Sequence, residues 1–346
     1  MFYPIEGRYV TISGRHVFED GAAVLSWSGS GIAFRFTGDG LKLTLCCKYG
    51  PGQDYSGAYI GIWRNREKEP VLRFAVPNEK TTVMIPVTGS GDEIRIIKLT
   101  EAAYASVFLY GLETDGSVEP IPPKQRKIEF IGDSITCGFG IEGKDGIDPF
   151  RLDQENAKDA FAMKTAEALD ADADLIAWSG IGVYSFYVDP EVNEPNQVWL
   201  MPAIYPYEAP GWDKLKENGM RPRDHERFVP DIIVLYLGTN DASYTRGKSS
   251  RVASFKKAYI RFLEQIRAMD PASEILCLCG AMTPALTSTI RNAVAEVSRK
   301  DEKLHYYRMP IQEQKNGIGA LGHPNGYTQE KMSEFLTAEI RRIMKW

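Results

Sequence analysis

The sequence changes its pattern once, at the proline-rich segment of residues 119–126. Before this segment, short runs of β-branched and aromatic residues are separated by Gly, Pro, Asn and Asp, without helical periodicity of useful length. After it, apolar runs of strand length alternate with amphipathic stretches of helix length. We therefore predict two domains, residues 1–118 and 127–346. The linker over 119–126 is short and stiff, so the domains are expected to pack on one another.

The N-terminal domain is predicted to be a β-sandwich of jelly-roll type, because its apolar runs are short and are bounded by turn residues. No stretch within it favours a helix. The strand candidates are residues 24–27, 31–36, 41–46, 58–63, 81–85 and 93–97.

The C-terminal domain is predicted to be an α/β domain with a parallel sheet covered on both faces, that is, three α/β/α layers. Ligands bind such sheets beyond the carboxyl ends of the strands. The strand candidates are residues 127–131, 175–178, 231–237 and 274–279, with a weaker one at 304–307. The helix candidates are residues 157–169, 252–269, 288–300 and 327–344.

Polar residues follow directly after three of these strands. Ser134 follows the first strand, residues 179–182 the second, and residues 238–240 the third. His323 lies between the last strand and the terminal helix, so a loop can bring it to the same edge of the sheet. We therefore expect these segments to meet at one rim.

Ser134 is the candidate nucleophile at this rim. It opens a helix after the sharp turn at Gly132-Asp133, where backbone N–H groups can stabilise a developing oxyanion. A serine hydroxyl needs a base, and the imidazole of His323 is the best placed among the four histidines. The Asn240 amide can donate to the same oxyanion. Ordinary helix capping is the competing interpretation of these residues, and Asp241 is expected to brace its loop.

Together these residues resemble the SGNH (GDSL-type) hydrolase superfamily. Residues 132–134 stand for its first block, Gly180 for its second, residues 238–241 for its third and His323 for its last. Further segments look like carbohydrate esterase family 2, whose members are acetyl xylan esterases and relatives with a jelly-roll domain ahead of the hydrolase. These segments are residues 27–36, 98–102, 178–180, 201–205 and 322–325.

The resemblance implies a serine esterase that removes O-acetyl groups from plant polysaccharides or oligosaccharides through an acyl-enzyme. Ser134 would attack the acetyl carbonyl and His323 would serve as base and then acid. The oxyanion hole would comprise the N–H groups of Ser134 and Gly180 and the Asn240 amide, with Gly182 as the alternative to Gly180. No metal and no organic cofactor is implied.

The chain departs from the superfamily pattern beside the histidine. The superfamily usually has an Asp three residues before the His, but Ala320 stands there, and no carboxylate occurs between Gln314 and Glu330. In the family that this chain resembles, some members also rely on a Ser-His dyad without that Asp. We therefore expect a backbone carbonyl of residues 319–321 to accept from Nδ1 of His323.

The long segment of residues 185–228 exceeds normal connector length and is typical of a substrate-covering excursion. Its aromatic residues Tyr187, Trp199 and Trp212 are candidate substrate-binding residues for a sugar or acyl group. Packing of this segment onto its own domain explains the same residues equally well.

Composition narrows the partners. A net charge of −5 and a pI of about 5.6 do not favour binding to nucleic acid or to an anionic membrane.

The five cysteines do not have the spacing of a disulfide framework or of a metal site. They are expected to be buried small apolar residues in a reducing compartment. The start of the chain lacks a leader pattern, so we expect a cytoplasmic protein, or a secreted one if a leader has been removed. Oligomeric state is not predicted.

Two other function classes fit the same residues. A lipid esterase or thioesterase on this scaffold would need an apolar acyl tunnel rather than a shallow, aromatic-capped pocket. A carbohydrate-binding protein on a catalytically lapsed scaffold is conceivable because the usual Asp is missing. The sequence does not distinguish xylan from mannan, or one hydroxyl position from another.

Overall fold

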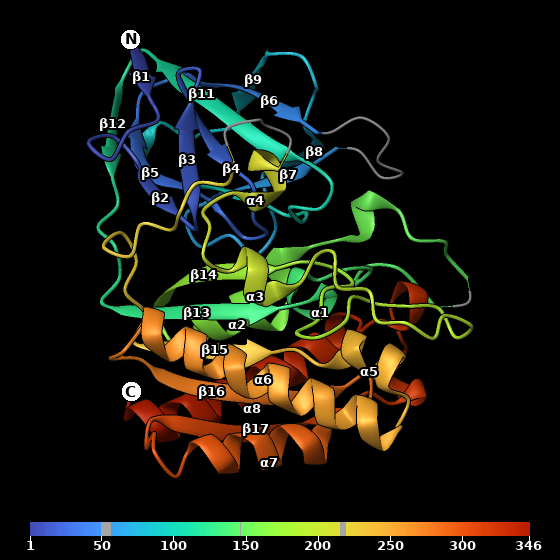
Figure 1. Cartoon of the computed structure of the whole chain (residues 1–346). Coiled ribbons are helices and arrows are strands. Elements are labelled where there is room, and N and C mark those ends of the chain that lie inside the picture. Colours follow the sequence, from blue (N-terminus) through green and yellow to red (C-terminus); the bar gives the residue numbers. More distant parts are fainter. Residues whose placement is uncertain (50–56, 146, 215–218) are drawn as a thin grey trace.

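The structure is a computed structural model that describes residues 1–49, 57–145, 147–214 and 219–346. It stacks a β-rich N-terminal part on a C-terminal part with a parallel sheet and helices (Figure 1). The predicted α/β domain preceded by a β-domain is therefore confirmed. The chain passes from one part to the other between Pro120, where β12 ends, and Arg126, where β13 begins.

The N-terminal part consists of two antiparallel sheets with apolar side chains between them. One sheet has the order β3-β4-β11-β6-β9 with β1 beside β11, and the other has the order β12-β5-β10-β7-β8 with β2 beside β5. Alternate residues of both sheets, such as Leu43 and Phe34, share one core. The strands are β1 (Phe2–Pro4), β2 (Thr11–Ser13), β3 (His16–Glu19), β4 (Ala22–Leu25), β5 (Gly31–Thr37), β6 (Leu41–Lys48), β7 (Tyr59–Arg64), β8 (Leu72–Ala75), β9 (Thr81–Ile85), β10 (Ser90–Lys98), β11 (Ser106–Thr114) and β12 (Ser117–Pro120).

The predicted sandwich is thus present, and each of its six predicted strands overlaps an observed one. The jelly-roll connection of these strands stays a prediction. Strands β1, β2, β3, β8, β11 and β12 were not predicted individually.

The C-terminal part is built on five parallel strands in the order β14-β13-β15-β16-β17. All five overlap predicted strands. The order reverses direction at β13, which is where open parallel sheets bind their ligands. The strands are β13 (Arg126–Gly132), β14 (Ala171–Ala177), β15 (Ile232–Tyr236), β16 (Glu274–Ala281) and β17 (Leu304–Ile311).

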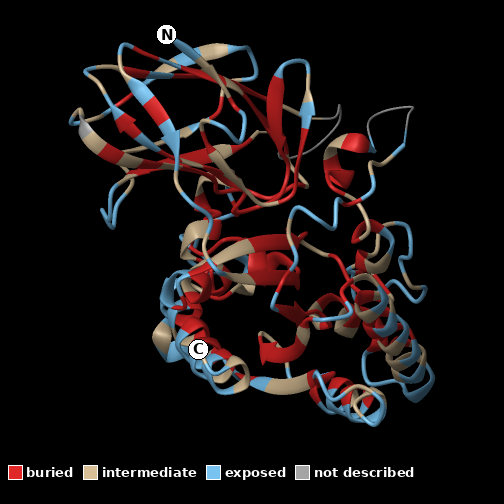
Figure 2. Ribbon diagram, turned by 90° about the vertical axis from the view of Figure 1, so that its left-hand side faces the viewer, coloured by how far each residue is buried: buried red, intermediate tan, exposed pale blue. Residues whose placement is uncertain are grey.

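Helices cover both faces of this sheet, as predicted. On one face, α2 (Phe161–Ala168) and α8 (Gly326–Met344) pack on side chains such as Phe130 and Val234. On the other, α6 (Ser249–Met269) and α7 (Thr287–Val297) pack on side chains such as Ile131 and Leu235. Figure 2 shows the buried residues concentrated in the strands and on the inner sides of the helices. Short helices α1 (Ser134–Cys137), α3 (Met201–Ile204), α4 (Pro210–Asp213) and α5 (Thr239–Thr245) complete the fold.

The two parts are joined by a buried charged contact as well as by the chain. Strand β2 contacts β14, the edge strand turned toward the sandwich (Figure 1). From the loop after β2, Arg15 reaches Glu129 with Nη2 at 3.1 Å, and its backbone N–H donates to Asp174 at 3.1 Å. Arg223 of the excursion also lies 3.3 Å from Glu129. The expected packing of the domains on one another is confirmed.

Two compositional expectations can be followed in the structure. All five cysteines are buried and unpaired, which confirms their prediction as small apolar side chains. In the described part of the chain, no helix has the length and apolar character needed to cross a membrane.

Candidate active site

Ser134 lies at the carboxyl end of the central strand β13. Asp133 caps the helix that begins at Ser134, and its Oδ1 accepts the N–H of Ile135 at 3.0 Å. Thr136 packs directly against Gly132, where a Cβ would collide with it, so the turn stays tight. Burial raises the pKa of Asp133 to about 7. The strand end, the cap and the glycine together present the Ser134 hydroxyl at the rim.

His323 meets Ser134 at this rim, as the sequence predicts. Its Nε2 lies 2.8 Å from Ser134 Oγ, although 189 residues separate them in the chain. Nδ1 lies 3.2 Å from each of two backbone carbonyls, Ala320 O and Leu321 O. Carbonyl oxygens only accept, so the proton is on Nδ1 and Nε2 is free to accept from the hydroxyl. The expected backbone acceptor is therefore present in the turn of residues 319–321.

The surroundings of His323 keep the imidazole neutral. Phe139 lies beside it with ring centroids 4.5 Å apart, and Phe150 stacks on Phe139. Burial lowers the pKa of His323 to about 4, against the two carbonyls, which raise it. At neutral pH the side chain is thus an unprotonated base.

The turn that carries the two carbonyls is held from outside. Asp145 accepts the N–H of Gly322 with Oδ1 at 2.9 Å, and its own N–H donates to Ile318 O at 3.1 Å. Leu321 lies in the chain between Ile318 and Gly322. Its φ of 52° is a left-handed backbone conformation that non-glycine residues rarely adopt. We call residues 318–322 the histidine turn, and Asp145 is its clamp. Sequence reasoning did not find this residue.

The three predicted oxyanion donors lie on neighbouring loops. Gly180 follows β14 with φ 80°, and a Cβ there would collide with the Phe186 ring. Asn240 stands in the first turn of α5, and its Nδ2 donates to Ile181 O at 2.8 Å and lies 3.4 Å from Asp133 Oδ2. Within the described ranges, the backbone N–H groups of Ser134 and Gly180 have no protein acceptor. These groups are therefore available to a ligand.

Asp241 braces the loop after Gly180. Its carboxylate accepts the N–H groups of Val183, Tyr184 and Ser185 at 3.0, 2.7 and 2.9 Å. Burial raises the pKa of Asp241 to about 6, while these three donors act to lower it. The side chain also packs against Gly182, so Gly182 belongs to this braced bend.

The predicted aromatic residues occupy different places. Tyr187 is half exposed, and its N–H donates to Gly180 O at 2.8 Å. Trp199 packs on Trp178 with ring centroids 5.4 Å apart, beside the same loop. Trp212 instead packs edge-on against Phe108 of the sandwich. The structure thus brings two of the three near the rim and places Trp212 at the contact between the two parts.

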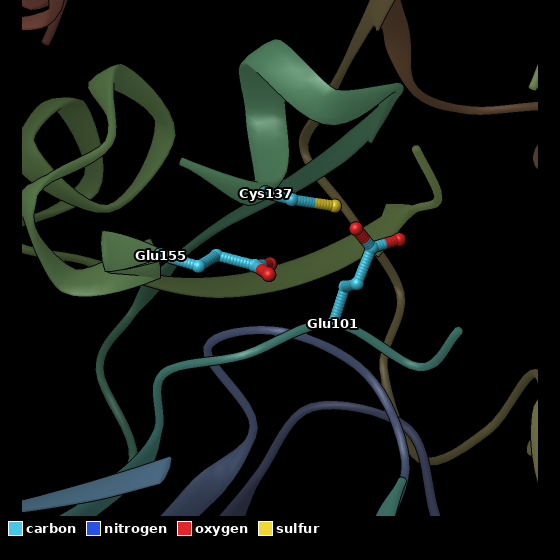
Figure 3. A group of neighbouring side chains, drawn as sticks. All are labelled: Glu101, Cys137 and Glu155. Carbon is cyan, nitrogen blue, oxygen red and sulfur yellow. The ribbon is translucent and has the colours of Figure 1, made fainter. Parts of the chain in front are cut away.

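One group of side chains has the spacing of metal ligands. Glu101, Cys137 and Glu155 converge with ligand atoms within 4.8 Å of one another (Figure 3). Metal ligation requires deprotonated donors, but burial raises the pKa of Cys137 and of Glu155 well above their usual values. Lys98, fully buried beside them, already supplies a positive charge, since its pKa of about 8 keeps it protonated at neutral pH. The group therefore does not fit a metal ion.

The comparisons with known proteins follow the two parts of the chain. Residues 130–314 match the GDSL-like lipase/acylhydrolase family, and residues 12–123 match the N-terminal domain of carbohydrate esterase family 2. A solved family two carbohydrate esterase from Clostridium thermocellum, in complex with cellohexaose, is 30% identical with a TM-score of 0.83. That alignment covers 97% of this chain and 99% of the other.

Two curated proteins are similar along nearly the whole chain. The cellulase/esterase CelE of Acetivibrio thermocellus is 32% identical over 349 residues, which is 97% of this chain and 40% of CelE. An acetylxylan esterase/glucomannan deacetylase of Cellvibrio japonicus is 27% identical over 348 residues, which is 98% of this chain and 90% of that protein. The chain therefore spans less than half of CelE and most of the second relative.

Proposed function

The chain belongs to the GDSL-like lipase/acylhydrolases and, within them, to carbohydrate esterase family 2, and we propose that it removes O-acetyl groups from plant-type polysaccharides or oligosaccharides. The observation that carries this proposal is the 2.8 Å contact between Ser134 Oγ and His323 Nε2, with Nδ1 held on two carbonyls. A hydroxyl paired with an oriented, neutral imidazole is the arrangement that covalent ester hydrolysis needs.

The proposed reaction passes through an acetyl-enzyme. Ser134 Oγ bonds to the acetyl carbonyl carbon while its proton moves to His323 Nε2. The bond between that carbon and the sugar oxygen then breaks, and the sugar oxygen takes the proton from His323. In the second half, a water gives a proton to His323 and attacks the acetyl group. Acetate leaves, and Ser134 regains its proton.

The oxyanion in each half would be held by three donors. The N–H groups of Ser134 and Gly180 lack protein acceptors in the described ranges, which supports this role. The contact of Asn240 with Asp133 is long, at 3.4 Å, so the amide can exchange it for a charged oxygen. These donors matter more here than in a full triad, because a neutral carbonyl stabilises imidazolium less than a carboxylate does.

The relatives support a carbohydrate as the alcohol part of the substrate. One solved relative was obtained with cellohexaose, and one curated relative is named an acetylxylan esterase/glucomannan deacetylase. Tyr187 and Trp199, beside the Gly180 loop, are proposed to contact the sugar.

The net charge of −5 disfavours nucleic acid as a partner. Five unpaired, buried thiols support a reducing compartment such as the cytoplasm.

The first test compares the protein with its Ser134→Ala variant on 4-nitrophenyl acetate. We expect kcat to fall by at least about 10³-fold, because removal of a catalytic nucleophile leaves only the binding groups. The kcat of His323→Ala is expected to fall by a similar factor, since the two residues act as a unit. Ser298→Ala, at the C-terminal cap of α7, is the control. Equal rates for the protein and Ser134→Ala would exclude Ser134 as the nucleophile.

A second test separates acetyl esterase from lipid esterase. Acetate release from acetylated xylan and glucomannan oligosaccharides is compared with hydrolysis of octanoyl esters. We expect kcat/KM to favour the acetylated sugars. A preference for octanoyl esters would replace the proposal with the lipid esterase alternative, and binding without release would favour a lapsed, carbohydrate-binding protein.

A further inference from the structure

A buried carboxylate of the sandwich, that of Glu101, accepts two hydrogen bonds from Ser179, the residue that precedes Gly180. Glu101 lies just after β10 and has no exposed surface. Its Oε2 accepts the backbone N–H of Ser179 at 2.7 Å, and its Oε1 accepts the Ser179 hydroxyl. One carboxylate thus holds both the main chain and the side chain of one residue. These contacts join positions 78 residues apart and cross from one part of the molecule to the other.

The loop that carries Glu101 is itself fixed. Lys98 donates with Nζ to Thr100 O at 2.5 Å and to Glu101 O at 3.0 Å, and it is fully buried. The carbonyl of Leu99 accepts the N–H of Ala157, which ties the loop to the α/β part at 3.0 Å. Glu101 is therefore presented from a rigid support, as a positioning group requires.

The held residue is next to a proposed oxyanion donor. The Gly180 N–H belongs to the peptide unit that follows the Cα of Ser179. Holding the N–H and hydroxyl of Ser179 limits how this residue can rotate, and the Phe186 ring packs closely against Gly180. Oxyanion donors act only within a few tenths of an ångström of the correct place.

We infer that Glu101 is a positioning residue that the sandwich contributes to the oxyanion hole by fixing Ser179 and thereby Gly180. The inference rests on the proposed ester hydrolysis. It gives the N-terminal domain a part in the reaction besides any contact with the carbohydrate. Glu101 does not touch the reacting atoms; it acts through the peptide unit of residues 179 and 180.

The chain offers a matched control in Glu155. This side chain is fully buried and lies in the same group of side chains as Glu101 (Figure 3), and within the described ranges its two carboxylate oxygens have no hydrogen-bond partner. In the described part of the chain, no hydrogen bond joins its carboxylate to Ser179. Glu101→Leu and Glu155→Leu therefore remove the same group from the same environment, but only the first releases Ser179. Glu101→Gln is the conservative variant, because an amide can accept the N–H and donate to the hydroxyl.

Each variant is measured in two ways. A fluorophosphonate probe reacts with Ser134 by forming a P–O bond and expelling fluoride, while the proton passes to His323. The final extent of labelling gives the number of active sites. The rate of labelling depends on the oxyanion donors, because the P=O oxygen of the probe binds in the oxyanion hole. The kcat per labelled site and KM are then measured on 4-nitrophenyl acetate.

For Glu101→Leu we expect kcat per active site and the labelling rate to fall about 10- to 100-fold, with KM within about threefold. For Glu101→Gln and for Glu155→Leu, we expect both rates to stay within about threefold of those of the unaltered protein. Ser179→Ala loses one of the two contacts, so its rates are expected to lie between those of Glu101→Leu and those of the unaltered protein. If Glu101→Leu does not fold, Ser179→Ala and Glu101→Gln carry the test.

Three results would overturn the inference. They are a kcat of Glu101→Leu per active site within threefold of the unaltered protein, an equal fall in Glu155→Leu, and a loss confined to the number of active sites. If the unaltered protein reacts with the probe but not with acetyl esters, the proposed function fails. The labelling rates then still decide the role of Glu101.

Discussion

At the scale of single residues, the imidazole of His323, the proposed catalytic base, has an unusual set of partners. Two neutral carbonyls hold its Nδ1, and an aromatic ring covers one side. This environment favours the uncharged form and gives up part of the stabilisation that a carboxylate would provide to imidazolium. The proposed oxyanion donors would therefore have to carry more of the transition-state stabilisation.

The pH dependence of activity follows from this environment. Burial lowers the pKa of His323 to about 4 from the usual 6.5, and the base works only when unprotonated. We therefore expect kcat/KM to stay level as the pH falls through 6.5 and to reach half its maximum near pH 4. The measurement is hydrolysis of 1-naphthyl acetate between pH 3.5 and 8, with tryptophan fluorescence as the check on folding. An acid limb centred near pH 6.5 in folded protein would contradict it.

The catalytic candidates could be predicted from the sequence, but their supports could not. Ser134, Asn240 and His323 stand just beyond predicted strands or before a predicted helix, and parallel topology brings such positions together. Glu101 and Asp145 act through contacts between residues 78 and 177 apart in the chain, and no local pattern indicates such partners. Trp212 shows the same limit, because an aromatic residue in a long loop does not reveal which surface it packs on.

At the scale of elements, the ends of strands and helices decide where the chemistry lies. The predicted strands of the parallel sheet overlap β13 to β17, because continuous apolar runs between helical patterns are a strong local signal. Helix α5 was missed because it has only seven residues and follows a glycine. Strand β11 was missed although it pairs with both β4 and β6 in the sandwich. Its residues 107–110 are apolar and aromatic like those of the predicted strands, so the sequence does carry the signal for this strand.

The histidine turn gives a prediction at this scale. Asp145→Ala removes the acceptor of the Gly322 N–H, so the two carbonyls that orient His323 become less fixed. We expect kcat to fall about three- to tenfold with KM unchanged, because small misplacements of a catalytic group act on the rate rather than on binding. Steady-state kinetics on 4-nitrophenyl acetate provide the measurement.

Asp148→Ala is the matched control for the clamp. Asp148 lies in the same loop and accepts only the N–H of Lys144 among the bonds found in the described ranges, so it does not reach the histidine turn. Its kcat is expected to match that of the unaltered protein. The clamp is refuted if both variants lose activity to the same extent, since the loop as a whole would then be responsible.

At the scale of the whole molecule, buried charges join the sandwich to the parallel sheet. Arg15 is 3% exposed and lies between Glu129 and Asp174, both on strands of the sheet. Breaking a buried pair leaves an uncompensated charge, which costs far more than losing a surface pair. The stability of the two parts is therefore coupled.

We expect Arg15→Met to lower the free energy of unfolding by about 3 to 5 kcal/mol, because Asp174 loses its buried partner and Glu129 keeps only Arg223. Arg8→Met is the control: Arg8 pairs with Glu6 at the surface, and its loss should cost less than about 1 kcal/mol. Equilibrium urea denaturation followed by tryptophan fluorescence measures both. Equal effects of the two substitutions would show that the buried contact does not couple the domains.

The buried arginine also bears on how such genes can be recombined. A coding sequence cut at the linker would yield a sheet in which Glu129 and Asp174 have lost a counter-ion and edge strand β14 its cover. Crossovers between homologous genes are then disfavoured at the linker unless both parents encode the same complementary charges. Natural shuffling and laboratory chimeras alike should move the two halves as a single cassette.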